Sequence, residues 1–309
     1  MKPKSYQTHP VLNQDVIDLI NLNLSSFSRI ILAISTVRSG STALMRVFAA
    51  VGIPSYFQEI KNTLRWKMIG INHPCTLPQI PCKDLFLKET LGPYTQTECT
   101  FNPLEILLKA GLPKDRIHLV IIGRDPLHTW ASCNSLWGQN TRIELMIQAF
   151  HTVEKIRCYA LQNKIPSTCL TLETFKHESS ETVIRKLFWR LDIPFHIQAV
   201  KNWEKLPFFG TKGSNIFFPK EPEIFDMPQG LAVIKQSSRL NYKAGIRDIS
   251  SLKKSDRNKI SQNGLLEIYK LWNETCRINL SADFQNGSLY LKTAGKKTFQ
   301  STNTQPRSL

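Results

Sequence analysis

Long apolar runs are absent from this chain of 309 residues, although apolar residues make up 41% of it. No stretch approaches the roughly 18 consecutive apolar residues that span a bilayer. The amino terminus is basic but is not followed by the compact apolar core of a signal peptide. These absences predict a cytoplasmic protein with no transmembrane segment.

Cysteine pairs of the Cys-x-x-Cys type are also missing. The cysteines number seven and are scattered, so the sequence predicts neither a disulfide framework nor a thiolate metal site. No His, Cys and Asp residues share the spacing of metal ligands, and we expect no metal. Reduced thiols fit a reducing compartment.

Acidic residues are few relative to basic ones, with 24 Asp and Glu against 40 Lys and Arg and a formal net charge of +16. An excess of this size indicates an anionic partner. Much of the charge is diffuse, lying in a run at residues 253–259 that is typical of a solvated helix face, and in the polar tail. Because no basic stripe interleaved with aromatics and no helix-turn-helix pattern is present, we expect no nucleic acid partner.

Apolar, β-branched runs alternate with segments of helical period. The runs predict strands at residues 29–34, 84–88, 117–123 and 167–172. The helical patterns lie at residues 41–51, 126–137, 142–162, 181–191 and 263–276. This alternation predicts an α/β fold with a central, mostly parallel sheet flanked by helices.

The chain is expected to form one domain over residues 29–280. Residues 1–28 are expected to be a lead-in, and residues 281–309, rich in Ser, Thr, Asn, Gln and Lys, a flexible polar tail. Residues 201–229 are rich in Pro, Gly and Phe without a clear period. A long loop of this kind in a compact domain is usually functional, and we expect a lid or a substrate wall.

Residues 35–42, Ser-Thr-Val-Arg-Ser-Gly-Ser-Thr, join the first strand to the first helix. Free backbone N–H groups and the helix dipole make such a junction an anion site. Gly40 lets the backbone approach a phosphate, and Arg38 adds a fork of donors. The hydroxyls of Ser39, Ser41 and Thr42 can contact the anion or cap the helix.

The loop lacks the Gly-Lys-Ser/Thr ending of the Walker A pattern and its upstream glycine. It resembles instead the 5′-phosphosulfate loop of sulfotransferases that use 3′-phosphoadenosine 5′-phosphosulfate (PAPS), with Val37 where that family usually has Pro. The resemblance implies a P-loop NTPase-like three-layer fold and PAPS as donor, with adenosine 3′,5′-bisphosphate as product.

A second motif follows the strand at residues 117–123. The family places an Arg at this strand end and a Ser eight residues later, both on the nucleotide's 3′-phosphate; Arg124 and Ser132 match them. On a helix these two residues are about two turns apart and could meet one phosphate. A looser likeness continues through Glu173, an acidic position with a scaffold role, so that the resemblance covers residues 29–195.

The resemblance also implies catalytic residues. Arg38 would stabilise charge on the leaving phosphate, Lys88 would contact the sulfuryl group, and Glu59 would be the general base, as in tyrosylprotein-type members. Glu89 is the rival base.

Two histidines, His73 and His128, are further candidates for the base, because His is the commonest one. The third nucleotide contact would come from Lys212 and Gly213, which resemble the family's Arg-Lys-Gly loop; a plain surface turn explains this pair equally well.

The function that follows is sulfuryl transfer from PAPS to a hydroxyl or amine of a small-molecule or carrier-bound acceptor. A nucleotide or small-molecule kinase is the first alternative, although it would need a Walker-type Lys and a Mg²⁺-binding acid. A catalytically inactive nucleotide-binding scaffold is the second. Sugars, lipids, phenols, peptides and natural products all stay open as acceptors.

Overall fold

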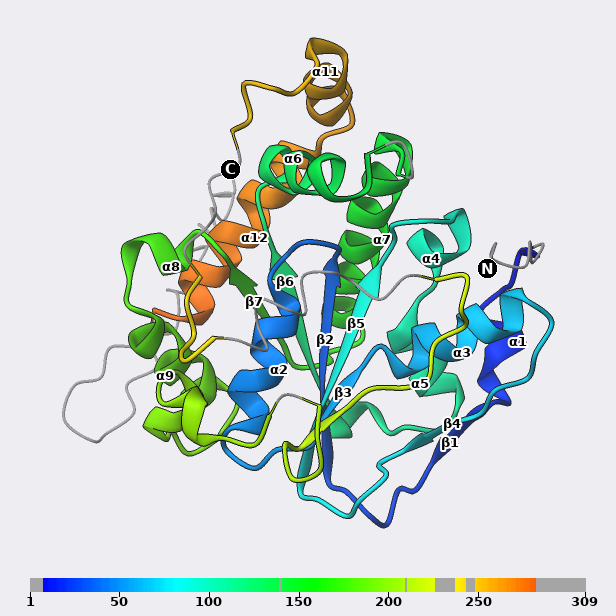
Figure 1. Ribbon diagram of the computed structural model, residues 1–309, viewed down its shortest axis with the longest axis vertical. Helices are drawn as coiled ribbons and strands as arrows, with labels where there is room; N and C mark the ends of the chain where they lie inside the picture. Colours follow the sequence, from blue (N-terminus) through cyan, green and yellow to red (C-terminus); the bar gives the residue numbers. More distant parts are fainter. Residues whose placement is uncertain (1–7, 139–140, 209, 226–236, 243–247, 282–309) are drawn as a thin grey trace, which may run out of the picture.

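The central feature is a six-stranded sheet in which every neighbouring pair of strands is parallel (Figure 1). The computed structural model describes residues 8–138, 141–208, 210–225, 237–242 and 248–281. The strand order is β7-β6-β2-β5-β3-β8. These strands are β2 (Arg29–Thr36), β3 (Ser55–Phe57), β5 (Asp84–Leu91), β6 (Ile117–Gly123), β7 (Ser167–Thr171) and β8 (Ile216–Phe217).

Helices cover both faces of this sheet. The α-helices around it are α2 (Ser41–Ala49), α3 (Glu59–Met68), α4 (Gln96–Thr100), α5 (Pro103–Lys109), α6 (Pro126–Trp137), α7 (Ile143–Gln162), α8 (Thr174–His177), α9 (Ser180–Arg190), α11 (Lys254–Gln262) and α12 (Leu265–Asn279). Short 3-10 helices are η1 (Lys114–Arg116), η3 (Ile197–Ala199) and η4 (Trp203–Lys205). The expected α/β fold with helices flanking a parallel sheet is therefore confirmed.

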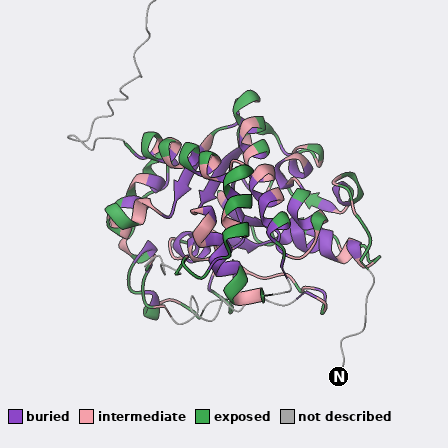
Figure 2. Cartoon of the chain, turned by 90° about the horizontal axis from the view of Figure 1, so that it is seen from above, coloured by how far each residue is buried: buried purple, intermediate pink, exposed green. Residues whose placement is uncertain are grey.

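The core lies between the sheet and these helices. Strands β2 and β6 are almost wholly buried, as their continuous apolar runs require when both faces are covered. Figure 2 shows buried segments in the interior and exposed helix faces on the outside. On one face Phe48 of α2 stacks on Phe86 of β5, with ring centroids 4.2 Å apart, and lies 5.2 Å from Phe188 of α9. On the other face α3, α4, α7 and α12 pack on the strands.

Residues ahead of β2 pack on this domain. Helix α1 (Gln14–Ile17) contacts α3 and α5, and β1 (Ile20–Leu22) pairs in parallel with β4 (Cys75–Leu77). Val16 is fully buried in the main core. The part of the expected lead-in that the structure describes is thus packed against the sheet domain. All but the first residue of the expected polar tail lies outside the described residues.

The carboxyl ends of the strands share one edge of the sheet, at the top of Figure 1. From β2 the chain crosses to β3 by way of α2, returns through α3 to β5, and then passes β2 to reach β6. The direction of the connections thus reverses between β2 and β6, and parallel α/β sheets bind ligands at the carboxyl edge beside such a reversal.

Two further properties concern the chain as a whole. All seven cysteines are free thiols, five of them buried. Among the helices that the structure describes, none combines the length and apolarity needed to cross a membrane.

Candidate functional site

The loop from β2 to α2 lies at the carboxyl edge of the sheet and contains two residues whose backbone angles are in the left-handed region. Arg38 has φ of 63° and Gly40 has φ of 78°. Gly40 is the N-cap of α2 and provides no side-chain cap. Among the described residues the N–H groups of Ser41 and Thr42 have no partner, whereas that of Ala43 donates to the carbonyl oxygen of Gly40 at 3.0 Å, and the positive end of the helix dipole favours an anion there.

The hydroxyls of this loop are mostly turned inward. Ser39 is fully buried, and its Oγ has no hydrogen-bond partner among the described residues. Ser41 is buried and Thr42 half-buried. Val37 packs in the core with 8% of its surface exposed, so that only its backbone is available to a ligand. A buried hydroxyl without a partner costs stability, which a ligand oxygen would restore.

The structure brings Arg124 and Ser132 to this loop. Arg38 Nε donates to Ser132 Oγ at 3.0 Å, and Arg124 Nη1 donates to the carbonyl oxygen of Arg38 at 2.8 Å. Burial, and next to it the charge of Arg38, lowers the pKa of Arg124, while Glu173 and Asp125 offset this in part. Two cations held together beside a helix N-terminus form a site that an anion would stabilise.

Local chemistry explains why α6 begins where it does. Asp125 is its N-cap, and Oδ1 accepts from the N–H groups of Leu127 and His128 at 2.9 and 3.0 Å. Pro126 occupies the first helical position, where its missing N–H is not needed. The cap fixes the helix axis, so that Ser132 faces back toward the loop.

Tyr242 also contacts this loop, and no sequence pattern pointed to it. Its hydroxyl donates to the carbonyl oxygen of Gly40 at 2.8 Å, and its ring lies 4.4 Å from that of Phe175. A Cβ built on Gly40 would lie 2.5 Å from the Tyr242 ring. Glycine is therefore required at position 40 both by its backbone angle and by this ring.

Glu59 lies two strands away, at the carboxyl end of β3. It is the first residue of α3, only 6% exposed, and its Oε1 has no partner among the described residues. Burial raises the pKa of this carboxyl to about 8, and the neighbouring charge of Glu89 adds to the shift. A carboxyl with a pKa near neutrality suits a general base.

Lys88 lies on β5, the strand next to β3 in the sheet. It pairs with Phe57, and Nζ lies 4.0 Å from the centroid of the Phe57 ring. Burial, and then the charge of Lys61, lowers the pKa of Lys88 well below its ordinary value. Among the described residues Lys88 makes no ion pair, so an incoming anion would favour its charged form.

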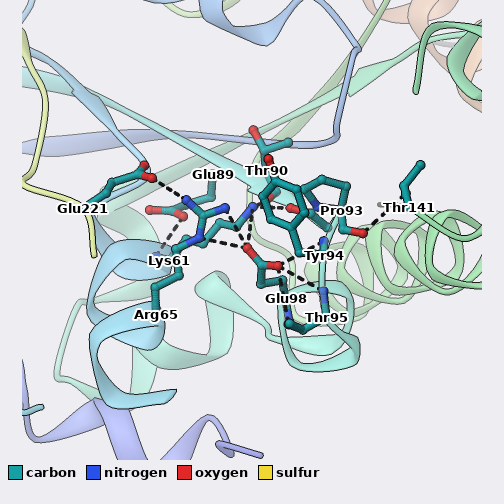
Figure 3. A network of polar contacts seen from close by, with 11 residues as sticks. Lys61, Arg65, Glu89, Thr90, Pro93, Tyr94, Thr95, Glu98, Thr141 and Glu221 are labelled. Atoms are coloured by element: carbon teal, nitrogen blue, oxygen red, sulfur yellow. Dashed lines mark hydrogen bonds and ion pairs between the residues drawn. The ribbon is translucent and has the colours of Figure 1, made fainter. Parts of the chain in front are cut away.

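A buried network of charges fills the space beside this edge, around Glu98 of α4 (Figure 3). Glu98 Oε1 lies 2.7 Å from Arg65 Nη2 and 3.4 Å from Lys61 Nζ. Its Oε2 accepts from the N–H groups of Tyr94 and Thr95, both at 3.1 Å. Burial pushes the pKa of Glu98 upward, but Lys61 and Arg65 outweigh it and hold that pKa below its ordinary value.

The same network anchors the aromatic segment that follows β8. Arg65 Nη1 lies 2.6 Å from Glu221 Oε2, with both side chains buried, and Trp66 Nε1 donates to the carbonyl oxygen of Lys220 at 2.8 Å. The Arg65 guanidinium also lies 4.6 Å from the ring centroid of Phe225. Residues 220–225 of the expected loop at 201–229 are thus fixed to α3, while residues 209 and 226–229 of that loop lie outside the described residues.

The other predicted residues lie apart from this cluster. Lys212 and Gly213 precede β8, whose first residue pairs with the first residue of β3, so they lie near the amino edge of the sheet. His73 follows the far end of α3 and stacks on Trp66 at 5.3 Å. His128 lies on α6, with Nδ1 buried and without a partner among the described residues.

The remaining candidates share one edge over four adjacent strands, β6, β2, β5 and β3. Strands in a sheet are about 4.8 Å apart, so the backbone of the loop after β2 and that of Glu59 after β3 lie about 10 Å apart across the sheet. A transferred group and its acceptor atom fit within such a span. Among the described residues no group of three or more His, Cys, Asp and Glu could hold a metal ion.

Comparisons with known proteins add little to this geometry. No family model matches the sequence, and no curated protein matches it either. Among solved structures, a mouse sulfotransferase complexed with PAP is similar, with a TM-score of 0.49 and 11% identity over 87% of this chain and 98% of that chain. A similarity at this level carries no argument about activity or site residues.

Proposed function

We propose that this protein is a sulfotransferase that moves a sulfuryl group from PAPS to a hydroxyl or amine. The observation that supports it most is the meeting of Arg38, Arg124 and Ser132 at the N-terminus of α2. These residues form a doubly cationic site beside the N-terminus of α2, which suits a ligand carrying phosphates at two positions.

On this proposal the donor nucleotide lies over β2 and β6. The N–H groups of α2, together with Ser39, Ser41 and Thr42, would hold the 5′-phosphosulfate, and Arg124 and Ser132 the 3′-phosphate. Arg38 lies between the two phosphate positions, because its side chain contacts Ser132 and its carbonyl oxygen accepts a hydrogen bond from Arg124. Lys212 and Gly213 have no place in this arrangement.

The acceptor would approach from β5 and β3. Its oxygen or nitrogen forms a bond to sulfur as the bond between sulfur and the 5′-phosphate oxygen breaks, and its proton passes to the Glu59 carboxylate. Lys88 would stabilise the moving group, and the anchored segment before Phe225 would form a wall for the acceptor. Free thiols remain compatible with a cytoplasmic location.

Kinase activity is the weaker candidate because the loop has Arg38 and no Walker-type Lys before Ser41. Thermal unfolding distinguishes the candidates. At a hundred times its dissociation constant, adenosine 3′,5′-bisphosphate should stabilise the fold by about 2.7 kcal/mol, and ATP with Mg²⁺ should do so far less. No shift with the bisphosphate, or a larger shift with ATP and Mg²⁺, would overturn the proposal.

Glu59→Gln tests the catalytic step. It should leave bisphosphate binding intact and lower transfer from ³⁵S-labelled PAPS to a panel of phenols, sugars and amines by about 10²–10⁴-fold, because the base is lost. Wild-type transfer should increase as the pH rises through about 8, where Glu59 ionises. Undiminished transfer by the variant would remove Glu59 as the base; binding without transfer by the wild type would favour the inactive scaffold.

A further inference from the structure

Glu89 performs the capping of a helix to which it does not belong. Its Oε1 accepts from the N–H of Ile60 at 2.9 Å, and its Oε2 from the N–H of Lys61 at 3.2 Å. These are the second and third residues of α3. The N-cap of α3, Gln58, has φ of 55° and gives no side-chain cap, so a fully buried carboxylate from β5 satisfies these groups instead.

Contacts with β5 flank Glu59 on both sides along the chain. On its other side, the N–H of Gln58 donates to the carbonyl oxygen of Lys88 at 2.8 Å. The backbone before and after Glu59 is therefore tied to two consecutive residues of β5. The Glu59 carboxyl itself is buried with Oε1 unpartnered among the described residues, so its position is set through the backbone and its oxygen is left for a ligand.

We infer that Glu89 is a positioning residue, which holds the N-terminus of α3 and through it the base Glu59. This inference rests on the proposed function for the role of Glu59 as the base. The contacts of Glu89 with the N-terminus of α3 are independent of that function. Because both oxygens of Glu89 are engaged by backbone N–H groups, Glu89 is poorly placed to take a proton from an acceptor. On this inference Glu89 positions the base and is not itself the base.

Electrostatics supports the same role. Burial raises the pKa of Glu89 to about 7, while the N–H groups of Ile60 and Lys61 and the charges of Lys88 and Lys61 act in the opposite direction. The charge of Glu89 in turn raises the pKa of Glu59.

The other titratable groups facing Glu59 come from two further strands. Cys75 of β4 and Tyr56 of β3 both have their pKa values raised, first by burial and also by the charge of Glu59. Both side chains keep their protons at neutral pH, so neither adds a charge beside Glu59. Removing the charge of Glu89 should therefore move the titration of Glu59 to lower pH.

Glu89→Gln, which keeps the shape but removes the charge and one acceptor, is the deciding variant. Amide hydrogen exchange at Ile60 and Lys61 should accelerate by about tenfold or more, because one hydrogen bond of the cap is lost. The ¹³C carboxyl resonance of Glu59, assigned by its loss in Glu59→Gln, should titrate at lower pH. Glu89→Asp, which keeps the charge but not the reach, should accelerate exchange with a smaller change in titration.

Ser179→Ala is the matched control, since Ser179 Oγ caps α9 by accepting from the N–H of Thr182 at 3.1 Å. It should lower the melting temperature without changing either measurement at α3. Unchanged exchange at Ile60 and Lys61 in Glu89→Gln, or an unchanged Glu59 titration, would overturn the inference. Neither measurement needs nucleotide or acceptor, so a wild type that fails to bind the bisphosphate would defeat the proposed function alone.

Discussion

The two halves of the carboxyl edge are built differently, one around a loop at a helix N-terminus and the other around a buried ionic network. On β2 and β6 the described contacts of Arg38 and Arg124 are to a hydroxyl and a carbonyl, and a buried hydroxyl at Ser39 has no described partner. On the α3 side, Arg65 and Glu98 belong to a buried ionic network. After the roles proposed for them, we call the first the donor half and the second the acceptor half. Variants should separate the two, with binding lost in the donor half and stability changed in the acceptor half.

The largest effect is expected for Arg65→Ala in the acceptor half. The change removes a guanidinium shared by Glu98 and Glu221 and leaves two carboxylates buried with fewer partners. The free energy of unfolding should fall by about 3–5 kcal/mol, as measured by denaturant titration. Arg185→Ala, which breaks an exposed pair with Glu181, is the control and should cost at most about 1 kcal/mol. A similar small loss for both variants would show that the network contributes little.

Gly40→Ala should have the next largest effect, in the donor half and on binding. The new Cβ would meet the Tyr242 ring at 2.5 Å, and alanine is strained at φ of 78°. Displacement of the loop should weaken bisphosphate binding by about 100-fold or more, measured by calorimetry. Gly52→Ala is matched to it, because Gly52 has φ of 85° just after α2 and its Cβ would meet nothing within 4 Å. Equal losses of affinity in the two variants would refute the role of this contact.

Arg124→Ala should weaken bisphosphate binding by about 30-fold, which corresponds to about 2 kcal/mol for a lost charge-assisted hydrogen bond. Arg116→Ala is the control from the other end of β6. Arg116 Nη1 likewise donates to a carbonyl, that of Leu24, at 2.8 Å. Its loss should affect stability and leave affinity unchanged. Retention of full affinity by Arg124→Ala would exclude it from the 3′-phosphate site.

The donor half could be predicted from the sequence because its information is local. Strand β2, the loop and α2 are contiguous, and the strand, cap and helix around Arg124 and Ser132 follow one another directly. The predicted strand at residues 29–34 differs from β2 only by its extension to Thr36. Tyr242 could not be predicted, since its contact with Gly40 joins residues 202 positions apart and follows no local pattern.

The acceptor half was harder to predict because its inward faces are polar. Lys61 and Arg65 point into the protein from α3, so the apolar period that normally signals a helix is reduced there to Ile60, Leu64 and Met68. Strand β3 has only three residues, and its pairing with β5 and β8 is a long-range event. The sequence therefore suggested Glu59 and Lys88 only through a resemblance, and the cap provided by Glu89 not at all.

The smallest expected effect is a gain of stability on Glu59→Gln. Burial raises the pKa of Glu59 to about 8 in the folded protein, against an ordinary value of 4.5 in the unfolded chain. As the pH rises between these values, the unfolded chain releases this proton while the folded protein keeps it, so wild-type stability falls across this window. A glutamine cannot ionise and avoids this loss. The variant should match the wild type at pH 4 and exceed it by about 1–2 kcal/mol near pH 8.

Denaturant titrations at both pH values check this difference, with Glu274→Gln on the exposed face of α12 as the control. That variant should change the free energy of unfolding by less than about 0.5 kcal/mol at either pH, as is usual for surface substitutions. A gain confined to Glu59→Gln would mean that the acceptor half, stabilised by its own ion pairs, retains one carboxyl that costs stability. Such a cost is expected of a group placed for chemistry, whereas equal stability of wild type and variant at pH 8 would show that Glu59 is solvated like any surface residue.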